Sequence, residues 1–139
     1  MTQYETDFYQ WTQETACRLR SGEFTRIEIE ALVEEVEDLG KREKSALQSR
    51  LAVLICHLLK WEHQPAKRSK SWQATIELQR NRIKRLLNQS PSLGPFLNES
   101  LADTYSDAVL LAVKQTGLGK EKFPETCAYA LEDILEGGH

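Results

Sequence analysis

The stretch Leu51-Ala52-Val53-Leu54-Ile55-Cys56-His57-Leu58-Leu59 decides the fold of this chain. Eight of its nine side chains are apolar, so on a helix they would cover almost the whole circumference. A helix that is apolar nearly all round is usually the buried centre of its domain. The periodicity around the stretch predicts a helix from Lys41 to about His63, ended by Pro65.

Helical periodicity also precedes this stretch. Tyr4, Phe8, Trp11, Thr15 and Leu19 recur at spacings of four and three, which predicts a helix over about 4–21 with Gly22 as its C-terminal cap. The segment Thr25-Arg26-Ile27-Glu28 has the form of a capping box and predicts the start of a second helix. This helix is expected to stop near Gly40 and to carry one apolar stripe, made of Ile29, Leu32, Val33, Val36 and Leu39.

The pattern continues after Pro65. Ser71 is expected to cap a helix from Trp72 to about Gln89, and the Pro- and Gly-containing segment 90–95 breaks the chain. Two more helices are predicted over about 96–115 and 125–136. Since no segment alternates like a half-buried strand, the sequence predicts an all-α, single-domain helical bundle of five to six helices with short connections over residues 1–139.

Length and composition limit the class of protein. A chain of 139 residues suits one core. The start has no basic and apolar signal, and no apolar run approaches the roughly 20 residues of a membrane span, so we expect a cytoplasmic protein without a membrane partner. The three cysteines lie far apart, which is typical of reduced thiols and not of a disulfide framework.

Several strings occur in the order known from one family. They are Glu34-Glu35-Val36-Glu37-Asp38-Leu39-Gly40, His57-Leu58-Leu59-Lys60-Trp61 with Gln64-Pro65, Ser71-Trp72-x-x-Thr75-Ile76 with Gln79-Arg80, Pro91-Ser92-Leu93, Thr116-Gly117-Leu118 and Phe123-Pro124. In these strings the chain resembles the bacterial, largely cyanobacterial, family catalogued as domain of unknown function number twenty-nine, from Tyr4 to Leu135. The resemblance implies an all-helical cytoplasmic domain. It implies no activity and no catalytic residues.

A basic segment follows the apolar stretch. Between Lys60 and Arg85 the net charge is +6, whereas the whole chain has −3. Basic groups beside Trp61 and Trp72 suit phosphate contact and base stacking, so the leading hypothesis is a binding or adaptor protein that engages an anionic partner, first of all nucleic acid. The residues expected to contact it are Lys60, Lys67, Arg68, Lys70, Arg80, Arg82, Lys84 and Arg85.

The acidic run Glu34-Glu35-Val36-Glu37-Asp38 supports a first alternative. Carboxylates spaced by three and four residues share a helix face and repel one another unless a cation offsets the charge. Glu34 and Asp38 are the candidate ligands of Mg²⁺ or Mn²⁺, although no cofactor is established. This alternative is a metal-dependent phosphoester hydrolase or nuclease, with candidate catalytic residues Glu34, Glu35, His57, Lys60 and Arg80.

Two further interpretations stay open. The acidic run and the basic segment can mate with each other, either within one subunit or across a homodimer, and the chain is then a protein–protein interaction module that binds another protein. His57 lies inside the most apolar helix, where an unpaired ring nitrogen would cost about 1–3 kcal/mol. We therefore expect His57 to hydrogen-bond a carboxylate of the acidic run, in a polar cluster that is either structural or functional.

Overall fold

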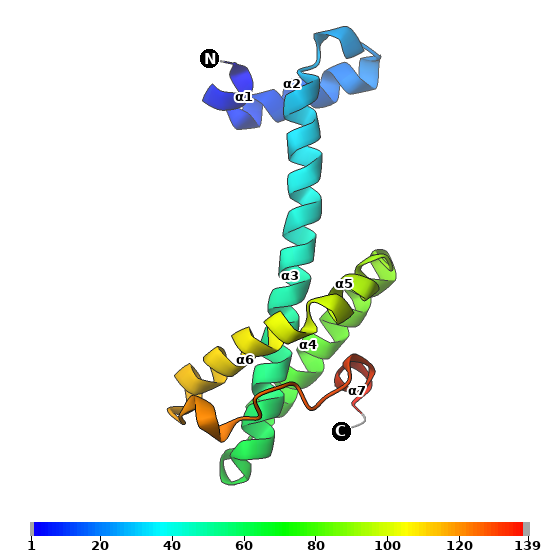
Figure 1. The fold of residues 1–139 in the computed structure, drawn as a ribbon. Coiled ribbons are helices and arrows are strands. Elements are labelled where there is room, and N and C mark those ends of the chain that lie inside the picture. The colour runs from blue at the N-terminus through cyan, green and yellow to red at the C-terminus, as the bar shows by residue number, and fades with distance from the viewer. Residues whose placement is uncertain (1, 138–139) are drawn as a thin grey trace. The chain divides into compact units, whose positions relative to one another are not determined.

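The computed structural model of the chain describes residues 2–137, which form α-helices and short 3₁₀ turns and contain no strand (Figure 1). The all-α fold class predicted from the sequence is confirmed. Residues 2–137 form seven α-helices, compared with the five to six predicted. No helix in this range combines the length and the apolar character needed to cross a bilayer.

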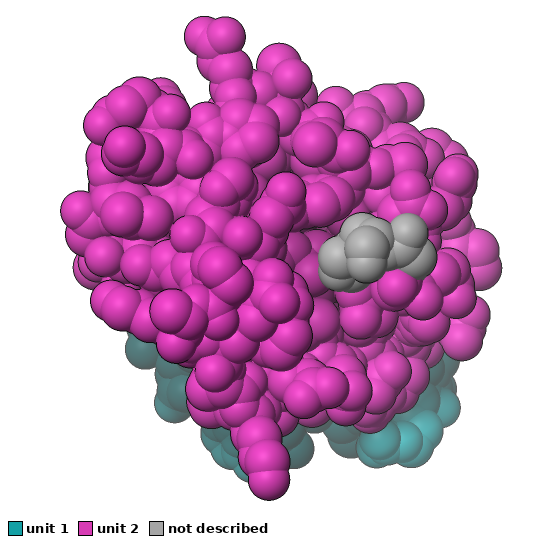
Figure 2. Space-filling view, turned by 90° about the horizontal axis from the view of Figure 1, so that it is seen from below, with its two compact units in different colours: residues 1–42 teal, residues 43–139 magenta. Residues whose placement is uncertain are grey.

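The chain divides into two compact units, which Figure 2 colours separately: residues 1–42 (unit 1) and residues 43–139 (unit 2). The division falls inside one long helix, α3, which spans Ile29–His63. The single domain expected over residues 1–139 stays a prediction.

Unit 1 begins with two helices, α1 (Gln3–Thr6) and α2 (Phe8–Ser21). The single helix predicted over residues 4–21 is interrupted at Asp7, because the Asp7 carboxylate accepts a hydrogen bond from the Gln10 amide at 3.1 Å and caps α2. The C-terminal cap is confirmed at Gly22, which has φ 78°, a conformation that glycine adopts without strain.

The start and the length of α3 differ from the prediction. The capping box over residues 25–28 does not form, since Phe24–Arg26 make a 3₁₀ turn, η1, and α3 begins at Ile29. The stop predicted at Gly40 is also wrong. A glycine inside a helix costs only about 1 kcal/mol relative to alanine. The good helix formers on either side of Gly40 offset this cost, so the second and third predicted helices are one helix.

Unit 2 contains the rest of α3 and the elements that follow it, namely η2 (Pro65–Lys67), α4 (Lys70–Gln89), α5 (Leu93–Glu99), α6 (Leu101–Thr116), η3 (Lys120–Lys122) and α7 (Leu131–Glu136). The cap of α4 is Ser69, whose hydroxyl accepts from the Trp72 amide at 3.2 Å, and not the predicted Ser71. The helix predicted over residues 96–115 is interrupted at Ser100.

The last helix begins at Leu131 and not near residue 125. The Tyr105 hydroxyl donates to the Pro124 carbonyl oxygen at 2.6 Å, so a tertiary contact holds the backbone of this segment in a non-helical path. Sequence periodicity does not reveal such a contact, so the predicted start of the last helix is too early.

The apolar stretch of residues 51–59 forms the interior of unit 2, as predicted. Only Val53 and His57 in this stretch are half-buried. On one side α4 packs antiparallel to α3, with Arg50 of α3 bonded to Gln79 at 3.5 Å. On another side α6 packs along α3, with Gln48 bonded to Thr104 at 3.2 Å. The core of unit 2 therefore lies among α3, α4 and α6, and it also includes Leu97 of α5 and Ile134 of α7.

Candidate functional site

Lys60, the first residue of the predicted basic segment, lies in the interior of unit 2. Its residue surface is 8% exposed, and its ammonium donates to Gln115 Oε1 at 2.9 Å. The same ammonium lies 4.6 Å from the centre of the Trp72 ring. A buried ammonium needs such partners, because a charge without them is costly in an apolar interior. Lys60 thus links α3 to α6 and α4, and its charge is engaged inside the unit.

Arg80 and Lys84 contact the short helix α7. Arg80 Nε donates to the Ile134 carbonyl oxygen at 2.7 Å, and Lys84 Nζ lies 3.3 Å from a carboxylate oxygen of Glu136. Burial lowers the pKa of Arg80 below its ordinary value. Both side chains therefore connect α4 to α7.

The other five cations of the predicted segment are exposed: Lys67, Arg68, Lys70, Arg82 and Arg85. The Arg68 guanidinium lies 4.9 Å from the Trp61 ring centre, and its Nε donates to the Trp61 carbonyl oxygen. One face of the Trp61 ring and one face of the Trp72 ring are thus covered by a cation. These half-buried rings offer a base little stacking surface, so contact with nucleic acid at this segment would be mainly electrostatic.

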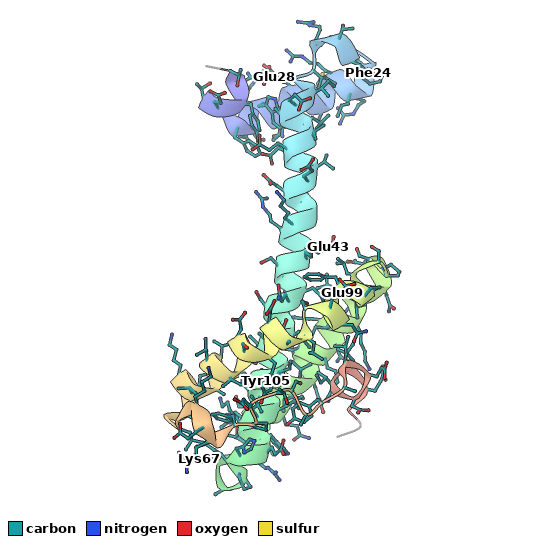
Figure 3. All side chains as sticks on the ribbon, in the orientation of Figure 1. Phe24, Glu28, Glu43, Lys67, Glu99 and Tyr105 are labelled. Atoms are coloured by element: carbon teal, nitrogen blue, oxygen red, sulfur yellow. The ribbon has the colours of Figure 1, made fainter. Side chains whose placement is uncertain are left out.

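A contact between the His63 and Phe123 rings places Lys120 and Lys122 near the predicted basic segment, which the sequence does not predict. The His63 ring packs edge-on against Phe123, with ring centres 5.3 Å apart. This contact brings η3 to the same end of unit 2 as η2, where Figure 3 labels Lys67. We call this the basic end, made of Lys67, Arg68, Lys70, Lys120 and Lys122.

Two acidic residues moderate the charge of the basic end. Glu121 is part of η3, and Glu62 accepts a hydrogen bond from the Tyr129 hydroxyl. No sequence motif joins residues 65–70 to residues 120–122, so only the fold reveals that they are neighbours.

The acidic run lies in unit 1, on the first part of α3. Glu35 accepts a hydrogen bond from the Tyr4 hydroxyl at 2.5 Å, and this bond raises the pKa of Tyr4 above its ordinary value. Within residues 2–137 no group of three or more His, Cys, Asp or Glu side chains is arranged to hold a metal ion. The pair Glu34 and Asp38, proposed for Mg²⁺ or Mn²⁺, therefore gains no third ligand of these types in the described part of the chain.

His57 is half-buried in unit 2 and has a different partner from the expected one. Its Nδ1 lies 3.0 Å from the Val53 carbonyl oxygen, one turn earlier on the same helix. The prediction of a carboxylate partner assumed two separate helices that pack face to face, whereas His57 and the acidic run belong to one continuous helix. Burial lowers the pKa of His57, which favours the neutral ring.

Most of the exposed large apolar side chains in the described residues belong to unit 1. Of ten exposed large apolar side chains in the described residues, eight are in this unit, whereas Leu78 and Leu110 are in unit 2. Among residues 2–42, only Trp11 and Ile27 are buried apolar residues. We call the eight the N-terminal apolar surface: Phe8, Tyr9, Leu19, Phe24, Ile29, Val33, Val36 and Leu39.

This surface includes most of the stripe expected inside a bundle. Ile29 is 52% exposed, Val36 59% and Leu39 63%, and only Leu32 of the predicted stripe is half-buried. Helical periodicity identifies an apolar face correctly but does not identify what covers it. Unit 1 therefore presents to solvent a face that has the composition of a packed one.

A groove of about 750 Å³ adjoins this surface within unit 1. Its apolar lining includes Ile29, Val33 and Tyr4. Five carboxylates line it as well, those of Glu5, Glu28, Glu30, Glu34 and Glu37. A lining that combines apolar side chains with carboxylates suits a segment that carries apolar and basic side chains together.

Comparison with known proteins gives one family. The model of the family described as domain of unknown function DUF29 matches residues 3–138. No curated protein and no solved structure matches the chain.

Proposed function

We propose that this chain, which belongs to the family of domains of unknown function DUF29, is a protein–protein interaction module that binds its partner through the N-terminal apolar surface. The observation that supports this proposal is the uneven distribution of exposed large apolar side chains. Within the described residues, eight of them are in unit 1 and two in unit 2. Contiguous exposed apolar patches in proteins mark interaction sites, whereas single exposed apolar residues are ordinary.

The energetic argument is direct. Burying one large apolar side chain contributes roughly 1.5–3 kcal/mol. A partner that covers Ile29, Val33, Val36 and Leu39 gains several such contributions, from which the cost of association is subtracted. The carboxylates that line the groove favour a partner surface that carries basic as well as apolar side chains.

Site-specific crosslinking tests this function. A photoreactive residue is placed at Val36 in one variant and at Leu110 in the other, because these positions are similarly exposed, at 59% and 58%, in different units. In the organism that makes the protein, we expect a discrete crosslinked species from position 36 only. Adding Val33→Ser and Leu39→Ser should remove that species. Equal crosslinking from both positions, or none from either, would refute the proposed function.

A second candidate function is nucleic-acid binding at the basic end. The observation in its favour is the His63–Phe123 contact, which adds Lys120 and Lys122 to the exposed Lys67, Arg68 and Lys70. Titration of labelled single-stranded and duplex oligonucleotides at two salt concentrations tests it, since phosphate contacts make affinity fall steeply with salt. Absence of binding at low salt would refute it for this chain alone.

The hydrolase alternative receives no comparable support. Two of its expected residues, Lys60 and Arg80, bond to Gln115 and to the backbone of α7.

A further inference from the structure

The groove of unit 1 is lined by side chains of two helices, α1 and α3. Tyr4 of α1 lines it, and the Tyr4 hydroxyl is bonded to Glu35, which connects α1 to α3. Ile29 and Val33, four residues apart on α3, form an apolar row in the lining. One position later on the same helix lie three exposed carboxylates that we call the acidic row: Glu30, Glu34 and Glu37.

We infer that the partner segment bound in this groove is a basic amphipathic α-helix of another protein, which lies along α3 over residues 29–37. Its apolar side chains would contact Ile29 and Val33, and its lysine or arginine side chains would face the acidic row. The inference rests on the proposed function, because it assigns the chemical class of the partner that covers the N-terminal apolar surface.

The charge of the groove selects a basic partner. Among the described residues that line it, five carry carboxylates and none carries a cation. No ion pair within residues 2–137 involves one of these five carboxylates. Carboxylates spaced by three and four residues on a helix repel one another, and cations placed opposite them offset this repulsion. An acidic or uncharged partner surface would leave the repulsion in place.

The backbone of the partner segment favours a helix. An extended peptide is usually held by main-chain hydrogen bonds to a strand edge, and the described part of the chain contains no strand. A helix satisfies its backbone N–H and C=O groups internally, and its side chains recur every three to four residues, like the two rows on α3. The axis of α3 rises about 12 Å between Ile29 and Glu37, which corresponds to roughly two turns of a partner helix.

Two cations limit where the basic side chains of the partner lie. Lys41 and Arg42 follow the acidic row on α3, are exposed, and are not part of the groove lining. Basic side chains are therefore favoured against residues 28–37 and disfavoured against residues 41–42. The partner helix should carry its positive charge towards the start of α3, where Figure 3 labels Glu28.

Binding of two synthetic peptides to the full chain tests the charge of the partner. Both peptides are amphipathic helices of about 18 residues with leucine on one face, and the other face carries lysine in one peptide and glutamate in the other. We expect the leucine–lysine peptide to bind at least about tenfold more tightly. Equal affinities, or no binding of either peptide, would overturn the inference.

A pair of variants with equal charge locates the binding. The variant without the acidic row combines Glu30→Gln, Glu34→Gln and Glu37→Gln. Its control removes the same charge from exposed positions of unit 2 and combines Glu99→Gln, Glu125→Gln and Glu132→Gln. Glutamine and glutamate have similar helix propensities, so α3 should be retained. We expect the first variant to bind the leucine–lysine peptide at least about tenfold more weakly and the control to stay within about threefold of the wild type. Equal effects would show general attraction to an acidic protein and overturn the inference.

The apolar row has its own control. Val33→Ser should weaken the leucine–lysine peptide by roughly three- to tenfold, because it removes an apolar contact in the groove. Leu78→Ser should not, since Leu78 is as exposed as Val33, at 44%, but belongs to unit 2. A peptide insensitive to Val33→Ser would bind by charge alone, which would overturn an amphipathic partner.

Crosslinking in cells separates this inference from the proposed function. The segment crosslinked to position 36 is identified by mass spectrometry, and we expect it to combine apolar residues at helical spacing with lysine or arginine. Removing the acidic row should weaken the crosslinked species. A crosslink specific to position 36 that joins a segment without these cations would overturn the basic helix and leave the proposed function intact. Absence of any such crosslink would overturn the proposed function as well.

Discussion

Lys60 donates to Gln115 Oε1 at 2.9 Å, and this bond connects the C-terminal part of α3 to the end of α6. The Lys60 residue is 8% exposed, and Gln115 Oε1 is the polar acceptor of its ammonium, with the Trp72 ring as the second partner. The first prediction follows from this dependence. Gln115→Leu should lower the free energy of unfolding by about 1–3 kcal/mol, because it leaves a buried charged donor without an acceptor.

Adding Lys60→Met to Gln115→Leu should recover most of that loss, since the charge is removed together with its acceptor. Urea unfolding of the two single variants and the double variant measures the coupling. Equal stabilities of Gln115→Leu and the wild type would contradict the importance of this bond.

His57 predicts a pH dependence of stability. Burial lowers the pKa of the folded-state ring, so the unfolded chain binds a proton more readily than the folded one. Stability is therefore fully present above the unfolded pKa of about 6.5 and falls as the pH decreases below it, towards the folded pKa. Unfolding measured between about pH 7.5 and pH 5 should show a smaller loss in His57→Gln than in the wild type. Parallel pH profiles would contradict the prediction.

Arg80 should hold α7 in place. Arg80→Lys removes the Nε donor to the Ile134 carbonyl oxygen, so backbone amides of Leu131–Glu136 should exchange hydrogen faster. The expected loss of protection corresponds to about 1 kcal/mol, the typical contribution of one hydrogen bond. The matched control is Arg82→Lys, since Arg82 is exposed on the same helix. Equal exchange in both variants would show that α7 does not depend on Arg80.

Gly40 tests the continuity of α3. It lies inside the helix with open space around the position of a Cβ atom, so Gly40→Ala should stabilise the chain by about 0.5–1 kcal/mol. Gly22→Ala should have the opposite effect, because Gly22 has φ 78°. Thermal unfolding followed by circular dichroism compares the two. Destabilisation by Gly40→Ala would mean that α3 bends or ends there.

The basic end makes a quantitative prediction for the second candidate function. If duplex nucleic acid binds there, Lys67→Gln with Lys120→Gln should reduce the slope of log affinity against log salt by roughly 1.8, about 0.9 for each lost phosphate contact. Arg82→Gln with Arg85→Gln removes the same charge from α4, outside the basic end, and should change the slope less. An equal reduction in both pairs would show that the contact extends along α4 and is not confined to the basic end.

The sequence predicts helices well where local signals are strong. Gly22 and the apolar residues 51–59 behave as expected, because a cap and an all-round apolar helix are local properties. The helix stop predicted at Gly40 is wrong, because the modest cost of glycine in a helix is outweighed by the helix propensity of its neighbours. Ser69 is a cap that competes with the nearby Ser71, and Asp7 interrupts a segment whose apolar spacing continues across it. Boundaries of this kind depend on small differences in free energy.

The candidate site was less predictable because it depends on contacts distant in sequence. Lys60 has the charge of a surface residue, and only its contact with Gln115, 55 residues later, reveals that it is buried. Lys120 joins the basic end through the contact between His63 and Phe123. Val36 is the opposite of Lys60: it belongs to a stripe with the composition of a buried helix face, and it is exposed.

The uneven distribution of buried residues also matters during synthesis, because the unit with few buried residues is made first. Unit 1 precedes unit 2 in the chain and leaves the ribosome earlier, although unit 2 holds nearly all of the core. At about 5–20 residues per second, the residues of unit 2 take roughly 5–20 s to follow. During this interval the nascent chain displays the N-terminal apolar surface before its larger core exists. A partner of this surface would therefore be able to bind it while unit 2 is still being synthesised.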